Sequence, residues 1–342
     1  MTPKRLIPIL ILLLASLLLS ACVAPTVLPA EAPPQAPATP THVQLSLGFI
    51  PSVQFAPFYV AIDKGFFADE NIEVELEHGF ETDFLKLLGT NERQFIVASG
   101  EQVILGRAQG LPVTYVATWY HKFPVVIFAP TSSGIRTPED LVGHKVGIPG
   151  LFGASYIAWK ALLHATGLPE DQITLESIGF TQAAAVSEGL VDAATDYAVN
   201  GPVQLRLAGD EVNVIAVDDY LQLPSNGLVT NETVLRENPE LVQGMVRAML
   251  RGIRYTLDHP DEAFDISLKH VPEAAQAVET NRAIYDASFE FWTPPAGRPL
   301  GFTDPEIWPA TAQFMYEAGL VDRLVDTQGI WTNDFAQAAG VQ

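Results

Sequence analysis

Flat aromatic side chains and neutral polar side chains recur in this sequence where predicted strands end. The aromatic members of the set are Phe55, Tyr59, Trp119, Tyr120, Phe152, Tyr156, Tyr197 and Trp292. The polar members are Gln54, Ser99, Gln102, Asn200, Ser225 and Asn226. Rings offer flat apolar surface, and amides and hydroxyls both donate and accept hydrogen bonds. The set therefore predicts a site for an uncharged aromatic heterocycle, stacked between rings and recognised at its edge.

Cations are scarce near these loops. His121 and Lys122 are the only ones there, and a solvated position at the rim is the simpler interpretation of both. A carboxylate, sulfonate or phosphate ligand would need an arginine clamp. The whole chain has 40 acidic and 19 basic residues and a formal charge of −21, which argues against nucleic acid as a partner. We attribute this acidity mainly to solubility.

No constellation of catalytic residues is evident. The histidines, at positions 42, 78, 121, 144, 164, 259 and 270, form no recognisable triad and no metal-ligand spacing. The glycine-rich loop Pro149–Gly153 lacks the Gly-Lys-Ser/Thr ending of a phosphate-binding loop. We therefore assign no catalytic residue, metal or cofactor. An enzyme remains the alternative of a different class, and a purely structural lipoprotein is a third.

The loop Pro51–Pro57 is the clearest of the candidate ligand loops. It follows an alternating strand at Val43–Leu47 and precedes a helix that closes at Lys64-Gly65. Ligands of open α/β sheets bind where strand ends meet helix starts, because helix N–H groups point outward there. Helix aromatics such as Tyr59 could instead face a core. Ser99 could likewise be a helix cap instead of a ligand contact.

The same alternation of strand, loop and helix continues along the chain. Further strands are predicted at 72–76, 95–98, 113–117, 125–129, 145–148, 173–178, 191–197, 212–217 and 228–230. Helices are predicted at 82–88, 103–108, 154–165, 181–188, 232–237, 239–259, 260–270, 272–292 and 304–319. This order predicts an α/β protein with largely parallel sheets and a helical tail that packs back on the first half.

The N-terminus has the pattern of an export signal. Lys4 and Arg5 precede the apolar run Leu6–Leu19, which is short for a transmembrane helix, and Leu19-Ser20-Ala21-Cys22 resembles a bacterial lipobox. We predict a lipoprotein signal peptide at 1–21, lipidation of Cys22 and a Pro/Ala-rich tether at 22–42. An ordinary signal peptide and an uncleaved anchor are the alternatives. Cys22 is the only cysteine, so it has no disulfide partner, and acylation would explain it.

Several motifs resemble the NMT1/THI5-like periplasmic binding proteins. They are Gly48-Phe49-x-Pro51, Ala56-Pro57-Phe58-Tyr59-Val60-Ala61, Lys64-Gly65-Phe66-Phe67, Arg107-x-x-Gly110-x-Pro112-Val113, Pro138-Glu139-Asp140-Leu141-x-Gly143-x-x-Val146-Gly147 and Gly189-x-Val191-Asp192-Ala193. The resemblance extends from residue 43 to about residue 270. It implies a type II solute-binding protein of an ABC importer, with a permease and its ATPase as partners. It specifies the ligand poorly.

The resemblance also implies two lobes that trap a small molecule between them. They would comprise residues 43–129 plus 224–342 and residues 130–223, with crossovers near Ala129 and Leu223. Ligands in the family include riboflavin and pyrimidine precursors of thiamin, and the eukaryotic enzymes of the family make such a pyrimidine with a cysteine-rich motif. The predicted mature fold has no cysteine, which argues against that activity.

The aromatic content of the loops decides between the two ligands. A three-ring flavin uses so much flat surface better than a single pyrimidine does, so riboflavin is the first choice and an aminopyrimidine is the alternative. Trp119 and Tyr120 are predicted to place a ring against the ligand. Burial of Trp119 in the core of a lobe is the competing interpretation.

Overall fold

The computed structural model of this protein describes residues 39–341. The predicted signal peptide at 1–21, Cys22 and most of the predicted tether lie outside the described residues. Within the described part of the chain, no helix has both the length and the apolar character needed to cross a membrane.

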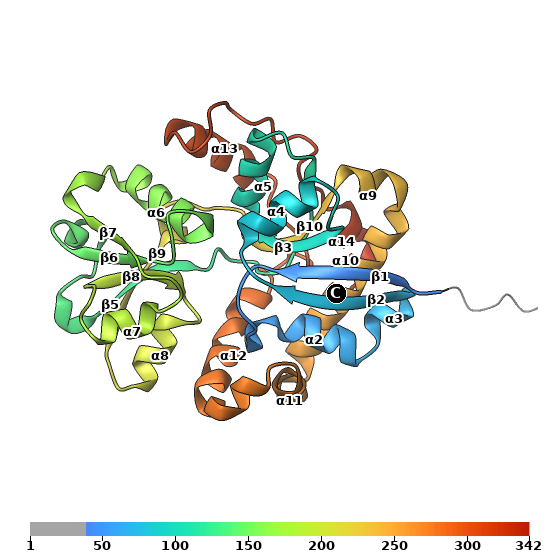
Figure 1. Cartoon of the computed structure of the whole chain (residues 1–342), viewed down its shortest axis with the longest axis horizontal. Helices are drawn as coiled ribbons and strands as arrows, with labels where there is room; N and C mark the ends of the chain where they lie inside the picture. Colours follow the sequence, from blue (N-terminus) through green and yellow to red (C-terminus); the bar gives the residue numbers. More distant parts are fainter. Residues whose placement is uncertain (1–38, 342) are drawn as a thin grey trace, which may run out of the picture. The chain divides into compact units, whose positions relative to one another are not determined.

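Two mixed five-stranded sheets form the framework (Figure 1). The first sheet has the order β2-β1-β3-β10-β4, with β1 at Thr41–Leu47, β2 at Ile72–His78, β3 at Phe95–Ser99, β4 at Val113–Thr118 and β10 at Asn226–Asn231. The second has the order β7-β6-β8-β5-β9, with β5 at Val125–Pro130, β6 at Lys145–Ile148, β7 at Thr174–Ser177, β8 at Ala193–Tyr197 and β9 at Val212–Ala216. The predicted α/β architecture is confirmed.

Each sheet contains one strand that runs against its neighbours. This strand is β10 in the first sheet and β5 in the second, and each is the strand that the chain enters after passing from the other sheet. The connections are residues 119–124 and 217–225. The boundary predicted near Ala129 is therefore wrong, because β5 already pairs with β8 and β9. An entirely apolar strand gives no signal of which sheet it joins. The boundary predicted near Leu223 falls within the second connection.

Helices cover both sheets. Those of the first lobe, defined as the elements around the first sheet, are α2 at Ala56–Asp63, α3 at Phe66–Asp69, α4 at Glu81–Gly89, α5 at Gly100–Ala108, α9 at Glu232–Glu237, α10 at Pro239–Asp258, α11 at Pro260–His270, α12 at Val278–Trp292, α13 at Ile307–Glu317 and α14 at Asp334–Ala339. Those of the second lobe are α6 at Gly153–Thr166, α7 at Gln182–Ser187 and α8 at Gly201–Leu207. Short 3-10 turns include η1 at Val53–Phe55 and η6 at Pro272–Ala277. The helix predicted over 272–292 is thus divided into η6 and α12.

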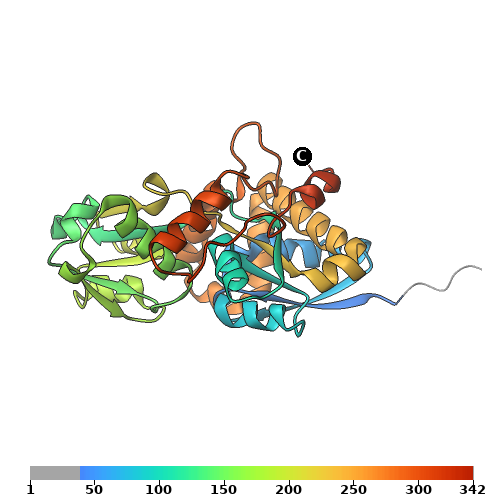
Figure 2. The ribbon, with the colours of Figure 1, turned by 90° about the horizontal axis from the view of Figure 1, so that it is seen from above.

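Burial on both faces explains the apolar character of the central strands. Every residue of β3 and of β4 is buried, as expected for strands covered by helices on both sides. The C-terminal segment returns along the first sheet, where α13 packs on α5, and α14 packs on α10 and β4 (Figure 2). The tail therefore belongs to the first lobe, as predicted.

The contact between α2 and α10 fixes the first candidate ligand loop from behind. A Cβ atom at Gly252 of α10 would lie 2.1 Å from the carbonyl oxygen of Pro57, so only glycine permits this approach. Such close packing holds the N-terminal end of α2, and with it η1, in a defined place.

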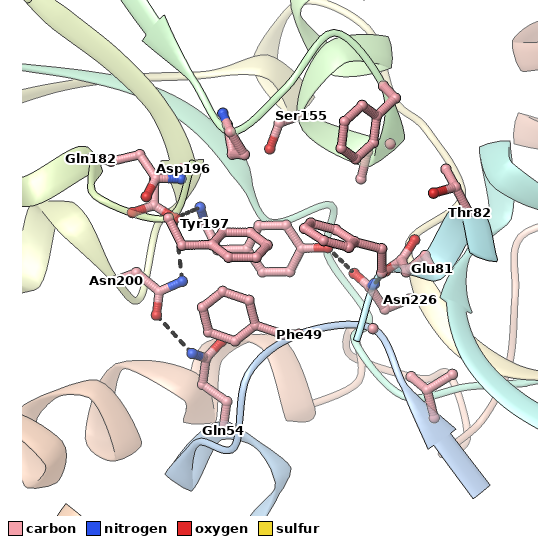
Figure 3. A pocket seen from close by; sticks show the side chains of 18 of the residues that line it. Phe49, Gln54, Glu81, Thr82, Ser155, Gln182, Asp196, Tyr197, Asn200 and Asn226 are labelled. Atoms are coloured by element: carbon pink, nitrogen blue, oxygen red, sulfur yellow. Dashed lines mark hydrogen bonds between the residues drawn. The ribbon is translucent and has the colours of Figure 1, made fainter. Parts of the chain in front are cut away.

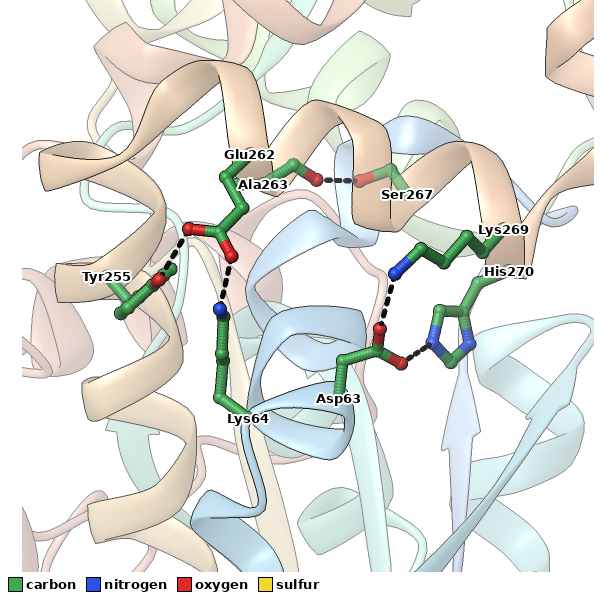
Figure 4. A network of polar contacts seen from close by, with 8 residues as sticks. All are labelled: Asp63, Lys64, Tyr255, Glu262, Ala263, Ser267, Lys269 and His270. Carbon is green, nitrogen blue, oxygen red and sulfur yellow. Dashed lines mark hydrogen bonds and ion pairs between the residues drawn. The ribbon is translucent and has the colours of Figure 1, made fainter.

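Charged pairs connect the C-terminal end of α2 to α11 (Figure 4). Lys64 pairs with Glu262, which also accepts a hydrogen bond of 2.6 Å from the Tyr255 hydroxyl. Asp63 lies 2.9 Å from His270 and 3.2 Å from Lys269. Exposed pairs of this kind contribute little to stability individually, about 0–1 kcal/mol each. They nevertheless define the register of α11 on α2.

Candidate functional site

A cavity lies between the two lobes where their strand ends face each other (Figure 3). It has a volume of about 800 Å³, including the part open to solvent. The first lobe contributes Gly48, Phe49, Gln54, Phe55, Phe80, Glu81, Thr82, Val97, Trp119 and Asn226. The second lobe contributes Pro149, Phe152, Gly153, Ala154, Ser155, Phe180, Gln182, Asp196, Tyr197 and Asn200. Ligand sites are expected at the carboxyl ends of strands in sheets of this kind.

The inner wall of the cavity is built from packed aromatic rings. Phe55 and Trp119 are stacked with ring centroids 5.2 Å apart and planes at 16°. Trp119 is also stacked on Tyr120 at 4.0 Å. Trp119 is only 2% exposed, yet it lines the cavity. Its ring is therefore buried in the core and also forms part of the cavity wall. The two interpretations of Trp119, a core residue and a residue of the site, each describe part of its environment.

The mouth of the cavity is formed by phenylalanines that meet across the gap between the lobes. Phe80 of the first lobe contacts Phe152 and Phe180 of the second, with ring centroids 5.5 Å apart in each pair. Phe49 approaches Phe180 edge-on at 5.0 Å. Phe80, Phe152 and Phe180 are 40–48% exposed, so these rings shield the cavity without being part of a core.

One chain of hydrogen bonds crosses from the first lobe to the second at one end of the cavity (Figure 3). The Gln54 side-chain amide donates to Asn200 Oδ1 over 2.7 Å, and Asn200 Nδ2 donates to Asp196 Oδ1 over 3.3 Å. Asp196 also accepts the backbone N–H groups of Tyr197 and Gly201 at 2.7 and 2.9 Å. Asp196 thus fixes the turn that begins α8, and this turn presents Asn200 to the first lobe.

A second chain joins the lobes at the opposite end. The Tyr197 hydroxyl donates to Asn226 Oδ1 over 3.2 Å, and Asn226 Nδ2 donates to Glu81 Oε1 over 3.0 Å. Gly48 permits this arrangement, because a Cβ atom there would lie 2.2 Å from Glu81 Cγ. Glu81 begins α4, so the end of β1, the start of α4 and the start of β10 meet at this carboxylate.

Two buried carboxyl groups, those of Glu81 and Asp196, line the cavity. Burial raises the pKa of Glu81 to about 7 and the pKa of Asp196 to about 6. Neither carboxylate forms an ion pair within residues 39–341, and no Lys or Arg lines the cavity. A bound phosphate, sulfonate or carboxylate would meet like charge without compensation, so the site favours an uncharged or cationic ligand.

The described residues contain no group of His, Cys, Asp and Glu side chains with the arrangement of a metal site. His78 lies beside the inner wall, where its ring contacts Phe55 at 5.4 Å and its Nδ1 lies 3.1 Å from the carbonyl oxygen of Phe49. Burial lowers the pKa of His78. Its contacts support the loop before η1.

Seven of the predicted site residues line the cavity. They are Gln54, Phe55, Trp119, Phe152, Tyr197, Asn200 and Asn226. Six come from the carboxyl ends of strands or from the loops that follow them, which is the feature on which the prediction was based. Asn226 begins the antiparallel strand β10, whose start lies beside the end of β3. Their contacts with a ligand remain predictions.

Seven predicted residues lie outside the lining. Tyr59 is buried between α2 and α11, where its ring stacks on His270 at 4.8 Å, because helix periodicity turns it toward the core. Tyr120 lies behind Trp119 and donates to Gln54 Oε1 over 3.4 Å. Ser99 is behind Glu81 and donates to it over 2.8 Å. Gln102 is buried within α5, and Tyr156 packs against a hydrophobic cluster that includes residues of both lobes. Ser225 donates to the carbonyl oxygen of Lys122 over 2.9 Å, and Trp292 is buried against Tyr285 and Phe289.

Other lining residues were not among the predicted site residues. The largest groups are the mouth rings Phe49, Phe80 and Phe180, and the carboxylates Glu81 and Asp196. The sequence carried a signal for Asp196, which stands beside Tyr197 at the end of a predicted strand. Glu81 resembles any acidic residue at the start of a helix, so no local pattern marks it.

The family profile described as NMT1/THI5 like matches residues 52–263. The riboflavin-binding protein RibY of Chloroflexus aurantiacus is 44% identical over 87% of this chain and 87% of its own length. The formylaminopyrimidine-binding protein of Halalkalibacterium halodurans is 29% identical over 78% of this chain and 82% of its own length. A 4-amino-5-hydroxymethyl-2-methylpyrimidine phosphate synthase of Legionella pneumophila is 26% identical over 86% of this chain and 92% of its own length.

Solved structures share the fold. The alkanesulfonate-binding protein SsuA of Xanthomonas axonopodis pv. citri, bound to MOPS, matches with a TM-score of 0.69 and 17% identity, over 86% of this chain and 99% of that protein. The fold is therefore that of the periplasmic binding proteins, as predicted. Similarity at this level of identity carries no information about the ligand.

Proposed function

Because this chain belongs to the NMT1/THI5-like family, we propose that it is the solute-binding protein of an ABC importer and that it captures riboflavin. The observation that carries the proposal is the composition of the cavity. Aromatic rings line its inner wall and its mouth, amides cross it at both ends, and no Lys or Arg lines it. A flavin is flat, uncharged and bordered by hydrogen-bonding groups, so it matches this composition.

The charge of the cavity supports riboflavin over its phosphorylated forms. A flavin phosphate would bring a dianion beside Glu81 and Asp196, and neither carboxylate has a cationic partner within the described range. A sulfonate, the class of ligand named for the structurally similar SsuA protein, would meet the same repulsion. The proposed ligand is therefore the free vitamin.

An aminopyrimidine of the thiamin pathway is the second candidate. A formylaminopyrimidine-binding protein is among the relatives, and the carboxylates could accept hydrogen bonds from an exocyclic amine. A single ring would leave much of the aromatic wall uncovered, which makes this ligand second to riboflavin.

An enzymatic role has less support, although synthases are among the relatives. The only cysteine is Cys22, near the N-terminus, so the described fold has no cysteine to contribute to chemistry. We propose a binding protein that returns its ligand unchanged.

Mass spectrometry of the small molecule that co-purifies with the protein tests the proposal. We expect riboflavin, released intact by denaturation, and a yellow protein solution with flavin absorption. Recovery of an aminopyrimidine would replace the ligand, and recovery of a converted product would support the enzyme.

Capture is proposed to involve closure of the two lobes. Hydrogen bonds from Gln54 to Asn200 and from Tyr197 to Asn226 connect the lobes across the cavity, and a ligand that contacts both lobes would favour this arrangement. Small-angle scattering should show a smaller radius of gyration with saturating ligand. An unchanged radius would argue against closure.

Anchoring to the outer face of the cell membrane is the last part of the proposal. It rests on Leu19-Ser20-Ala21-Cys22 and the Pro/Ala-rich stretch that follows. Cys22→Ala should release the protein from membranes and abolish lipid attachment, measured by fractionation and by the mass of the processed chain. A variant that remains membrane-bound at the wild-type mass would contradict the lipoprotein assignment.

A further inference from the structure

Two buried glutamates share one serine hydroxyl behind the wall of the cavity. Ser99 Oγ lies 2.8 Å from Glu81 Oε2 and 2.6 Å from Glu101 Oε1, and all three side chains are buried. A hydroxyl has one proton, so it can donate to only one of these carboxyl groups. The other group must donate to the hydroxyl oxygen. The geometry therefore requires a proton on one of the two glutamates.

The remaining hydrogen bonds place that proton on Glu101. Glu81 accepts the backbone N–H of Ser99 over 3.2 Å and the side-chain amide of Asn226 over 3.0 Å, and such donors stabilise an ionised carboxylate. Glu101 has weaker support: its Oε2 has no hydrogen-bond partner in the described chain, and the donors near it, its own N–H and the Gln102 side chain, offset only part of the cost of burial. The direction of donation is thus from Glu101 to Ser99 and from Ser99 to Glu81.

Glu81 has an acceptor position left for a ligand. A carboxylate has about four lone-pair positions, and the Ser99 N–H, the Ser99 hydroxyl and the Asn226 amide occupy three of them. Glu81 lines the cavity, and its free position is on Oε1, beside Asn226 (Figure 3). Trp119 also lines the cavity, and its buried indole N–H has no partner within residues 39–341.

We propose that Glu81 is the specificity-determining residue of the site, an inference that rests on the proposed function. It accepts a hydrogen bond from a ring N–H of the flavin, while neutral Glu101 maintains a single negative charge at that position. The free acceptor position of Glu81 complements a ring N–H at the edge of a heterocycle. The site would thus select heterocycles with such an N–H and reject those alkylated at that nitrogen.

The electrostatic surroundings agree with this assignment. Burial, followed by the charge of Glu81, raises the pKa of Glu101 to about 8. The other titratable groups that interact with the pair are the phenols of Tyr115 and Tyr197, and burial raises the pKa of both. Asp196 belongs to the second-lobe wall of the cavity and His78 lies beside Phe55. No cation forms an ion pair with either glutamate in the described part of the chain.

The first test compares riboflavin with N3-methylriboflavin, which lacks the ring N–H. Wild-type protein should bind riboflavin roughly 10- to 100-fold more tightly, the usual worth of a buried hydrogen bond to a charged group. Glu81→Gln should bring the ratio of the two affinities near one. Glu240→Gln, the same change at an exposed residue of α10 that does not line the cavity, should retain the wild-type ratio.

The ratio of the two affinities in the wild-type protein requires no variant, so it tests the ring N–H contact even if Glu81→Gln does not fold. Equal affinities for the two flavins would overturn the role of Glu81 while leaving riboflavin as the ligand. A protein that binds neither flavin would instead contradict the proposed function, and these two failures are distinguishable.

The second test follows unfolding of the ligand-free protein with pH. The folded-state pKa of Glu101 lies above its ordinary value of 4.5, so the folded chain holds a proton that the unfolded chain releases. Its contribution to stability is complete below about pH 4.5 and is lost as pH rises toward 8. Glu101→Gln has an amide that can donate to Ser99 at every pH, so its melting temperature should fall less between pH 5 and 8. An equal fall in wild type and variant would show that Glu101 is not the protonated member of the pair.

Discussion

The two carboxylates of the cavity are held in different ways. Asp196 accepts two backbone N–H groups and one side-chain amide, and it fixes the turn at the start of α8. Glu81 accepts one backbone N–H, one side-chain amide and a hydroxyl, and that hydroxyl is shared with a second glutamate. A backbone N–H cannot reorient toward another acceptor when its acceptor is removed, whereas a side-chain donor can rotate toward water or a ligand.

This difference separates structural from recognition roles within one cavity. Both residues line the cavity and burial raises the pKa of both, so neither exposure nor pKa distinguishes them. The identity of the donors does. We infer that Asp196 mainly maintains the fold of its loop, and that Glu81 mainly contributes to the choice of ligand.

The largest expected effect is on stability. Asp196→Ala leaves the N–H groups of Tyr197 and Gly201 without their acceptor, and each buried unpaired donor costs about 1–3 kcal/mol. We expect unfolding in urea to show a loss of about 3 kcal/mol. Asp258→Ala is the matched control, because its side chain is 53% exposed and its pair with Arg254, at 3.6 Å, is worth less than about 1 kcal/mol. Equal losses in the two variants would contradict the structural role of Asp196.

The next effect is on the pH dependence of binding. A ring N–H donates best to an ionised carboxylate, and the pKa of Glu81 is raised to about 7, so riboflavin affinity should rise between pH 5.5 and 8. The expected gain is roughly ten-fold. Asp196 has a pKa of about 6 and therefore ionises at lower pH than Glu81. The pH dependence of riboflavin affinity in Glu81→Gln measures the separate contribution of Asp196. A profile in Glu81→Gln as steep as in wild type would assign the dependence to Asp196 instead.

The smallest expected effect is at the mouth of the cavity. Phe152 is 48% exposed, so Phe152→Ala should change the melting temperature little. The lost ring contact with Phe80 should accelerate dissociation of the flavin by a factor of roughly 3 to 10, in keeping with aromatic pair energies of about 0.5–1.5 kcal/mol. Stopped-flow fluorescence measures the rate. An unchanged dissociation rate would show that the mouth rings do not retain the ligand.

The sequence correctly predicts site residues whose position follows from the end of a strand. Trp119, Phe152 and Tyr197 follow from the order of strands and loops, because the carboxyl ends of parallel strands must share one edge of a sheet. The prediction fails where burial depends on distant segments. Glu81 becomes a buried site residue only because Gly48, Ser99 and Asn226 converge on it from separate strands.

Pairing between strands and the direction of helix side chains caused the other differences. The first crossover was predicted near Ala129, at the end of the strand predicted at 125–129, because an apolar strand does not indicate its neighbours, and β5 joins the second sheet. Tyr59 was counted as a ligand residue from its position after the first loop. The turn of α2 directs its ring to His270 instead.

Titration of the purified, ligand-free protein with riboflavin and with riboflavin phosphate tests the central claim most directly. The account predicts saturable binding of riboflavin with quenching of flavin fluorescence, because the cavity presents stacked rings at Phe55 and Trp119. It predicts much weaker binding of the phosphate, because no Lys or Arg lines the cavity to compensate Glu81 and Asp196. Absence of riboflavin binding together with binding of an aminopyrimidine, or equal affinity for the phosphate, would contradict the account.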